Sequence, residues 1–373
     1  MALINLPEIS AGKAVKVISR YFVRMIKSGV EYKDIRSIIL FGPTGVGKSA
    51  SIEQIAKVIE AKTGKKVKVI DIRLTSCTVS DISGIPSADK ERTKTIWLRP
   101  EIYGDIEDMD NDDVIYIIFF DELDKASPAV QAAALQLILD RKAWTHKFPK
   151  NTVVIAAANP ARGTSKYETR MSPELLNRFK QYNVQADYES FRDWALSNKV
   201  HPYVLGYLSF DHSKLYAPNE SDSTAFPTPR SWKSVSDLLN SYDMDELSID
   251  DLHYDIAGDI GTGIALEFEA WCSVYSFLPS TKDIFAGKET KLPQTPDVLH
   301  ALIASLTDYI EHNFETITNA ELRNALRYVS RFPVDFAALF YKNIKEIDGI
   351  NLKLIMTEEY REWCEAHPEL AGR

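Results

Sequence analysis

The first half of the chain alternates short apolar runs with segments of helical periodicity. Four runs are rich in β-branched and aromatic residues: Ser37–Phe41, Val67–Arg73, Val114–Phe120 and Thr152–Ala158. This composition is typical of strands buried on both faces of a parallel sheet. Ala50–Ile59 has the pattern of a helix that follows the first run, and Ser127-Pro128 has the pattern of a helix start. The first half therefore predicts an α/β fold around a parallel sheet.

From about Asp187 the pattern changes to helices alone. The predicted helices are Ser190–Ser197, His201–Leu208, Ser231–Tyr242, Asp297–His312 and Asn319–Ser330. A polar stretch with a proline, Asp211–Ser223, predicts a loop between them. A chain of 373 residues is long enough for two cores. We predict a sheet-bearing domain over residues 1–186 and a helical region over residues 187–373.

Ala11–Ser28 predicts an amphipathic helix before the first strand. Apolar side chains share one face, and five cations lie mostly on the other: Lys13, Lys16, Arg20, Arg24 and Lys27. A basic amphipathic helix can bind a membrane surface or a target peptide. We favour a plainer interpretation, in which the helix packs on the sheet domain and its outer face is solvated.

The segment after the first predicted strand fits the phosphate-binding pattern G-x-x-x-x-G-K-[ST] at every fixed position. Its glycines let successive N–H groups turn inward toward phosphate oxygens, and the new helix adds its positive N-terminal end. Lys48 is placed to reach the β- and γ-phosphates, and Ser49 to ligate Mg²⁺. The predicted nucleotide contacts are Gly42, Pro43, Thr44, Gly45, Val46, Gly47, Lys48, Ser49 and Ala50.

Polar side chains also follow two other predicted strands. Asp121 and Glu122 come directly after Val114–Phe120, and Asn159 follows Thr152–Ala158. The carboxyl ends of parallel strands form the binding edge of an open α/β sheet. We predict that Asp121 holds Mg²⁺, that Glu122 polarises the attacking water, and that Asn159 orients the water or senses the γ-phosphate.

Two hairpins are predicted in the same domain. Within Ile82–Asn111, two extended runs flank the charged turn Asp89–Arg92, and the acidic Gly104–Asp113 predicts a surface loop. Trp144–Phe148 predicts a second, shorter hairpin, in which His146 is expected at the surface.

These motifs together resemble the AAA+ ATPases. Gly42–Ser49 is similar to Walker A, Phe119–Glu122 to Walker B and Asn159 to sensor 1; Ser172–Phe179 resembles the arginine-finger segment and Phe226–Trp232 resembles sensor 2. Within AAA+, the chain is most similar to the MoxR group, in a short form common in phage and prophage genomes. The narrower match rests on Asp81–Pro86, on Phe226–Trp232, and on Leu266–Phe268 to Leu278-Pro279.

The resemblance implies a three-layer αβα P-loop NTPase domain with a C-terminal helical lid and extension. It implies an ATPase that uses ATP and Mg²⁺ and works as a ring, most often a hexamer. Arg178 would then reach into the neighbouring subunit's site, with Arg162 and Arg170 as rival donors, and Arg230 would sense the γ-phosphate from the lid. The first hairpin would be the insertion that this clade projects toward the ring pore. MoxR proteins resemble chaperones that often act with a von Willebrand factor A-type partner.

The amino-acid composition limits which partners and which cellular compartment are expected. Cys77, Cys272 and Cys364 lie far apart, which argues against disulfides and zinc and favours a reducing compartment. No apolar run approaches the roughly 20 residues of a membrane span. We expect a bacterial cytoplasm or a phage-infected cell and no membrane partner. The net charge of −9 argues against broad nucleic-acid binding but is compatible with a local basic surface.

Two other classes of protein stay open from the sequence. One is a DNA-acting AAA+ protein, such as a helicase loader or a phage replication factor. Its candidate contacts are the cations of the first hairpin region: Lys90, Arg92, Lys94 and Arg99. The other is a structural or defence assembly that nucleotide switches between conformations. GTP is also compatible with the phosphate loop, because the loop contacts no base.

Overall fold

The structure is a computed structural model that forms two compact units. It describes residues 6–103, 111–143, 145–159, 171–218, 225–242, 249–275, 278–288, 290–293, 295–314, 316–345, 347 and 349–371. The first unit is Met1–Asn198 together with Thr228–Arg230, and the second is Lys199–Pro227 together with Ser231–Arg373. The first unit thus continues twelve residues beyond the predicted domain boundary at residue 186, because helix α6 (Tyr188–Ser197) contacts α1 (Ala11–Lys27).

The first unit is built on a six-stranded sheet in which every neighbouring pair is parallel. In spatial order the strands are β1 (Glu8–Ser10), β10 (Phe179–Gln185), β2 (Ser37–Phe41), β9 (Thr152–Ala158), β6 (Val114–Asp121) and β3 (Lys66–Arg73). The four predicted strands are confirmed, two of them with their bounds. β1 and β10 were not predicted. The central strands β2, β9 and β6 are buried almost throughout, as expected for strands between two helical layers.

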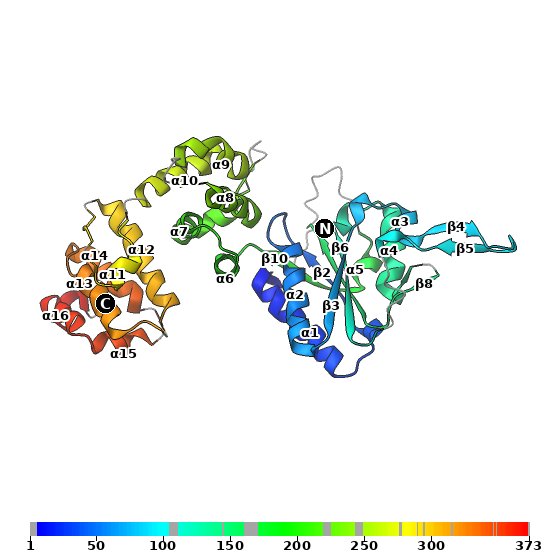
Figure 1. The fold of residues 1–373 in the computed structure, drawn as a ribbon, viewed down its shortest axis with the longest axis horizontal. Helices are drawn as coiled ribbons and strands as arrows, with labels where there is room; N and C mark the ends of the chain where they lie inside the picture. The colour runs from blue at the N-terminus through cyan, green and yellow to red at the C-terminus, as the bar shows by residue number, and fades with distance from the viewer. Residues whose placement is uncertain are drawn as a thin grey trace. The chain divides into compact units, whose positions relative to one another are not determined.

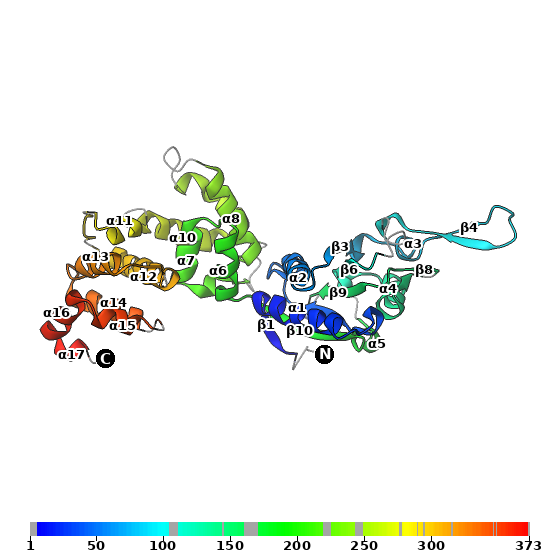
Figure 2. The ribbon, with the colours of Figure 1, turned by 60° about the horizontal axis from the view of Figure 1, so that its bottom comes forward.

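Helices cover both faces of this sheet (Figures 1 and 2). α1 and α2 (Lys48–Thr63) pack together over one face, and α4 (Pro128–Asp140) shares a hydrophobic core with the other. α4 begins at Pro128, and the Ser127 side chain accepts its Val130 N–H, as predicted. Three shorter helices complete the unit: α3 (Val79–Ser83), α5 (Pro173–Leu176) and α6. The predicted three-layer α/β architecture is confirmed.

Two hairpins leave the layered core. β4 (Ile85–Ala88) and β5 (Thr95–Leu98) pair antiparallel, and the hairpin extends away from the sheet (Figures 1 and 2). β7 (Lys142–Ala143) and β8 (His146–Lys147) form the second, which begins before the predicted Trp144. His146 is half-buried beside Gly84, so its prediction as a surface residue was wrong. Trp144 and residues 104–110 of the predicted acidic loop lie outside the described residues.

The second unit consists of helices, as predicted. They are α7 (Pro202–Phe210), α8 (Pro229–Ser241), α9 (His253–Ile260), α10 (Thr262–Tyr275), α11 (Thr281–Phe285), α12 (Pro296–His312), α13 (Asn319–Val329), α14 (Val334–Lys345), α15 (Ile350–Ile355), α16 (Glu358–Ala366) and α17 (Pro368–Ala371). Trp232 is fully buried beside the rings of Tyr207 and Phe268. A separate core joins α11 to α16. The predicted loop Asp211–Ser223 contains a 3₁₀ turn over His212–Leu215, and residues 219–223 lie outside the described residues.

Cys77, Cys272 and Cys364 are free thiols. Over the described ranges, no helix has the length and apolar character needed to cross a membrane.

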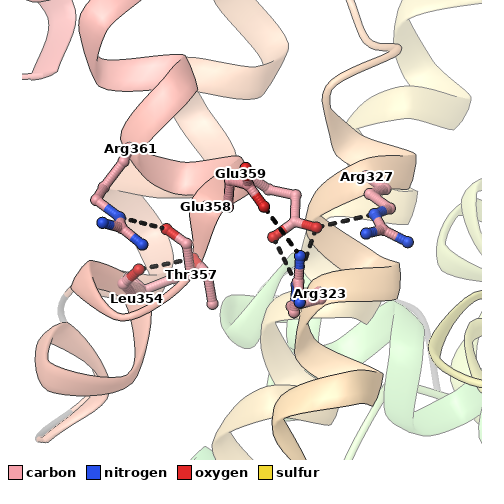
Figure 3. A network of polar contacts seen from close by, with 7 residues as sticks. All are labelled: Arg323, Arg327, Leu354, Thr357, Glu358, Glu359 and Arg361. Carbon is pink, nitrogen blue, oxygen red and sulfur yellow. Dashed lines mark hydrogen bonds and ion pairs between the residues drawn. The ribbon is translucent and has the colours of Figure 1, made fainter.

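An ion-pair network ties α13 to α16 (Figure 3). Glu359 Oε1 accepts hydrogen bonds from Nε of Arg323 at 3.1 Å and Nε of Arg327 at 2.8 Å, and Glu358 Oε2 accepts from Arg323 Nη2 at 3.3 Å. The Glu359 side chain is 9% exposed, whereas those of Arg323 and Arg327 are 40% and 63% exposed. Burial of Glu359 disfavours its charged form, but hydrogen bonds from the Glu359 backbone N–H and from the two guanidinium groups favour the charged form more strongly. They hold the pKa of Glu359 below its ordinary value.

Glu359→Gln should therefore lower the free energy of unfolding at neutral pH by about 1 kcal/mol, since both arginines are partly exposed. A carboxylate whose folded pKa is depressed stabilises above its unfolded pKa and loses that contribution as pH falls through the folded pKa. Wild type and variant should thus converge in acid. Urea denaturation at decreasing pH measures this, with Glu365→Gln, exposed on the same helix, as the matched control. A difference that persists unchanged in acid would exclude the ionic explanation.

Candidate active site

The phosphate-binding segment lies where β2 ends and α2 begins. Gly45 and Gly47 have φ of +85° and +94°, in the left-handed region that favours glycine. A Cβ at Gly45 would stand 2.8 Å from Oγ1 of Thr228, so a larger residue would clash there. The backbone can therefore curl tightly around a small anion, and the first N–H groups of α2 remain available to it.

Lys48 is the first residue of α2 and connects the loop to the neighbouring strand. Its Nζ donates to the carbonyls of Gly42 and Pro43, the latter at 2.9 Å, and to Asn159 Oδ1 at 3.2 Å. Burial lowers the pKa of Lys48 to about 8, although the carboxylates of Asp121 and Asp124 oppose this shift. Lys48 thus presents a desolvated cation between the phosphate loop and Asn159.

Ser49 and Asp121 bring two oxygen atoms together at the ends of α2 and β6. Ser49 Oγ donates to Asp121 Oδ2 at 3.0 Å, and Asp121 Oδ1 accepts the Glu122 N–H at 2.9 Å. A hydroxyl beside a carboxylate suits Mg²⁺, which binds oxygen and usually needs only one or two protein ligands besides phosphate and water. Among the described residues, no cluster of three or more His, Cys, Asp or Glu side chains forms a cage for a softer metal.

Glu122 follows Asp121 and has a strained backbone, with φ of +56°. Each of its carboxylate oxygens accepts one hydrogen bond: Oε1 from Lys125 Nζ at 2.6 Å and Oε2 from Thr75 Oγ1 at 3.0 Å. The hydrogen bond and ion pair with Lys125 hold the pKa of Glu122 below its ordinary value, and the Thr75 hydroxyl adds to this against the effect of burial. Glu122 is therefore a charged carboxylate at neutral pH.

Three residues of this site were missed in the sequence. Thr75 follows β3, whose last residue, Arg73, pairs with Asp121. Asp124 is buried, accepts the Asn159 backbone N–H, and has a pKa raised by burial. Lys125 completes the same 3₁₀ turn, Leu123–Lys125. Lys125 could have been found, since it is an opposite charge three residues after Glu122; Thr75 and Asp124 needed the strand order.

Asn159 lies where it was predicted, at the end of β9 between the strands that carry the phosphate loop and Asp121. Its side-chain oxygen faces Lys48. The structure thus brings Lys48, Ser49, Asp121, Glu122 and Asn159 to one edge of the sheet.

Arg178 is not brought to that edge in its own chain. It precedes Phe179, which pairs with Ser37 at the start of β2, whereas the phosphate loop follows Phe41 at the end of β2. The five residues of β2 separate these ends by about 16 Å. Arg178 is exposed. The rival donors Arg162 and Arg170 lie outside the described residues.

Arg230 lies in the first turn of α8, which begins at Pro229 rather than at the predicted Ser231. Thr228–Arg230 clusters with the first unit, and Thr228 abuts Gly45 of the phosphate loop. The positive charge of Arg230 contributes to lowering the pKa of Lys48. Thr228 and Arg230, within the segment that resembles sensor 2, therefore lie near the predicted phosphate site.

Comparisons with known proteins agree with this geometry. Residues 37–179 match the family model described as "AAA domain (dynein-related subfamily)". The chain is 24% identical over 223 residues to the chaperone protein ClpB of Oceanobacillus iheyensis, covering 55% of this chain and 26% of that protein. It is 30% identical over 168 residues to the chloroplastic ClpA homolog of Brassica napus, the ATP-binding subunit of a Clp protease, covering 40% of this chain and 17% of that protein.

The solved structures that resemble this chain have lower sequence identity to it than the two curated relatives. A RuvB mutant from Thermotoga maritima has a TM-score of 0.39 and 15% identity, with 85% of this chain and 89% of that chain covered. PCH-2 of C. elegans has a TM-score of 0.37 and 16% identity, with 72% and 71% covered. The chain spans about a quarter or less of the length of the two curated relatives. On the family match and the curated relatives, residues 37–179 form an AAA+ ATPase domain.

Proposed function

We propose that this chain is a ring-forming AAA+ motor of the MoxR type, which hydrolyses ATP to remodel or activate a partner protein. The observation that carries the proposal is the convergence of Lys48, Ser49, Asp121, Glu122 and Asn159 at one sheet edge. These are a phosphate-binding cation, a pair of oxygen ligands for a metal, a general base and a polar amide. Together they supply the groups that phosphoryl transfer to water requires.

Each group has a role that follows from its chemistry. Lys48 and the loop N–H groups hold the β- and γ-phosphates, and Arg230 adds a positive charge from α8. Ser49 and Asp121 would hold Mg²⁺, which neutralises charge that develops on the phosphate oxygens. Glu122 accepts a proton from the attacking water, and Asn159 orients that water.

Two hydrogen bonds hold the Glu122 carboxylate in place. Each of its two oxygens accepts one bond, from Thr75 or from Lys125, and keeps a further lone pair for a water within hydrogen-bond reach. The lowered pKa keeps Glu122 unprotonated while it waits.

A ring explains the position of Arg178. Its exposed side chain begins at the end of the sheet opposite the phosphate loop, so it cannot serve the site of its own chain. A head-to-tail neighbour would bring a second copy's phosphate loop to it. We propose a hexamer, on the resemblance to AAA+ proteins.

The hairpin β4–β5 is the proposed contact for a protein partner. Directly opposed residues of an antiparallel pair share a face, so Ile85, Leu98 and Ile96 lie together, 58%, 51% and 38% exposed. Trp97 pairs with Pro86 on the other face and is half-buried, so the exposed apolar face of the hairpin is aliphatic. ClpB, a relative of this chain, is itself named a chaperone protein. A von Willebrand factor A-type partner is proposed from the MoxR resemblance alone.

The hairpin gives the test of this function. Lys90→Ala combined with Arg92→Gly, which suits the φ of +56° at Arg92, should leave basal ATPase and assembly unchanged. The same variant should lose stimulation by protein partners that copurify with the chain from its native host. ATPase rates with and without those proteins measure this. Strong, salt-sensitive stimulation by DNA that disappears in the variant would overturn the proposal and favour the DNA-acting alternative.

A further inference from the structure

The outer face of α1 carries a stripe of positive charge. Ala14, Ile18 and Phe22 are fully buried against the sheet domain. The opposite face presents five exposed cations: Lys13, Lys16, Arg20, Arg24 and Lys27. With 3.6 residues per turn, these five lie within an arc of roughly 80° and span about 21 Å of helix. We call them the α1 stripe.

The α1 stripe is not neutralised by its surroundings. The helix holds five of the chain's 44 Lys and Arg residues and none of its 53 Asp and Glu residues. Within the described part of the chain, none of the five side chains forms an ion pair. The neighbouring α2 differs, because its exposed Lys57 and Lys62 are accompanied by the exposed acids Glu53 and Glu60. An ordinary solvated helix face has this mixed character, and the α1 stripe does not.

The basic surface continues beyond α1. Lys180 of β10 lies 3.7 Å from the ring centroid of Tyr21, and the Tyr21 hydroxyl accepts the Arg36 N–H at 3.2 Å. The exposed Arg36 side chain donates to the Asn177 carbonyl. A row of cations of this length suits an evenly charged linear polyanion.

We propose that the α1 stripe binds the phosphate backbone of a nucleic acid. This binding is independent of the proposed protein partner and of nucleotide turnover. It is sequence-independent, because phosphate contacts fix position and carry no base readout. The phosphodiester chemistry is common to DNA and RNA.

Other anionic surfaces fit the α1 stripe less well. A helix that lies in a membrane surface needs a free apolar face, and that face of α1 is buried in the protein. The residues that flank the stripe, Val17 and Val23, are half-buried. A protein interface is depleted in lysine and centres on aromatic or aliphatic anchors. The stripe has three lysines and no exposed apolar anchor.

Fluorescence anisotropy on the full chain tests the proposal, with labelled single-stranded DNA, duplex DNA and RNA oligonucleotides across a salt series. Five phosphate contacts predict a slope of log K against log [salt] of about −4.5 for a duplex and about −3.5 for a single strand. Arg20→Gln with Arg24→Gln should reduce the duplex slope to about −2.7 and weaken binding about 50-fold at 0.1 M salt. Unchanged basal ATPase would show that the variant is folded.

Lys57→Gln with Lys62→Gln removes the same charge from the adjacent exposed face of α2 and should retain binding. The hairpin variant at Lys90 and Arg92 should also retain it, which separates this inference from the proposed function. Equal loss in the α1 and α2 variants would overturn the proposal, because net charge alone would then explain binding. A second result would also overturn it: the chain binds phosphatidylserine vesicles through Arg20 and Arg24 but binds none of the oligonucleotides.

Discussion

A Glu122→Gln chain is expected to bind ATP and to hydrolyse it about 10²–10⁴-fold more slowly than wild type, the usual contribution of a general base. The amide cannot accept a proton from water, while it keeps the size of the carboxylate and a hydrogen-bond partner for Thr75. The phosphate loop, Ser49 and Asp121 are unchanged, so nucleotide affinity should persist. Steady-state phosphate release and titration with a fluorescent ATP analogue measure the two properties separately.

Two controls make this result specific. Lys48→Ala should lose ATP binding as well as turnover, because it removes the cation that bridges the loop and Asn159. Glu60→Gln, exposed on α2, should change neither. Turnover at the wild-type rate in Glu122→Gln would show that another group acts as the base.

Mixing Arg178→Ala subunits with Lys48→Ala subunits should restore ATPase activity that neither variant has alone. In one of its two orientations, a mixed interface pairs an intact phosphate loop from the first variant with an intact Arg178 from the second. An arginine supplied in trans contributes about 10³–10⁵ in rate in related P-loop enzymes, so even partial restoration will be measurable. The assay is phosphate release as a function of the mixing ratio.

The same experiment distinguishes the rival donors. Arg162→Ala or Arg170→Ala replaces Arg178→Ala in the mixture, and the variant that both abolishes activity and complements Lys48→Ala identifies the arginine that acts. Wild-type activity that is independent of protein concentration, from a species with the mass of one chain, would be incompatible with a ring.

The strands that could be predicted from the sequence are those buried on both faces of the sheet. β2 and β9 lie between helical layers and are buried at every position, so their apolar runs give their bounds. β10 reads Phe-Lys-Gln-Tyr-Asn-Val-Gln and is mostly half-buried, and β1 is a three-residue edge strand. Neither has a run long enough to be seen without its partner. Their pairing with each other and with β2 is a tertiary property.

Some residues of the candidate site could likewise be predicted from the sequence, and others could not. Residues at the ends of buried strands, such as Asp121 and Asn159, could be placed from the sequence because parallel strands end at a common edge. The restraint of Glu122 by Thr75 could not, because it depends on β3 being the neighbour of β6. The start of α8 at Pro229 could have been predicted from the sequence, since proline favours the first position of a helix.

The parallel sheet has a consequence for assembly. The phosphate loop follows the carboxyl end of β2, and Arg178 lies at the amino end of the adjacent strand. If Arg178 acts in trans, each copy offers a donor at one end of its strands and an acceptor at the other. An open row of such copies would always leave one donor and one acceptor unmatched at its two ends. Closing the circle would match them, so ring closure would itself create one more hydrolytic site without adding a subunit.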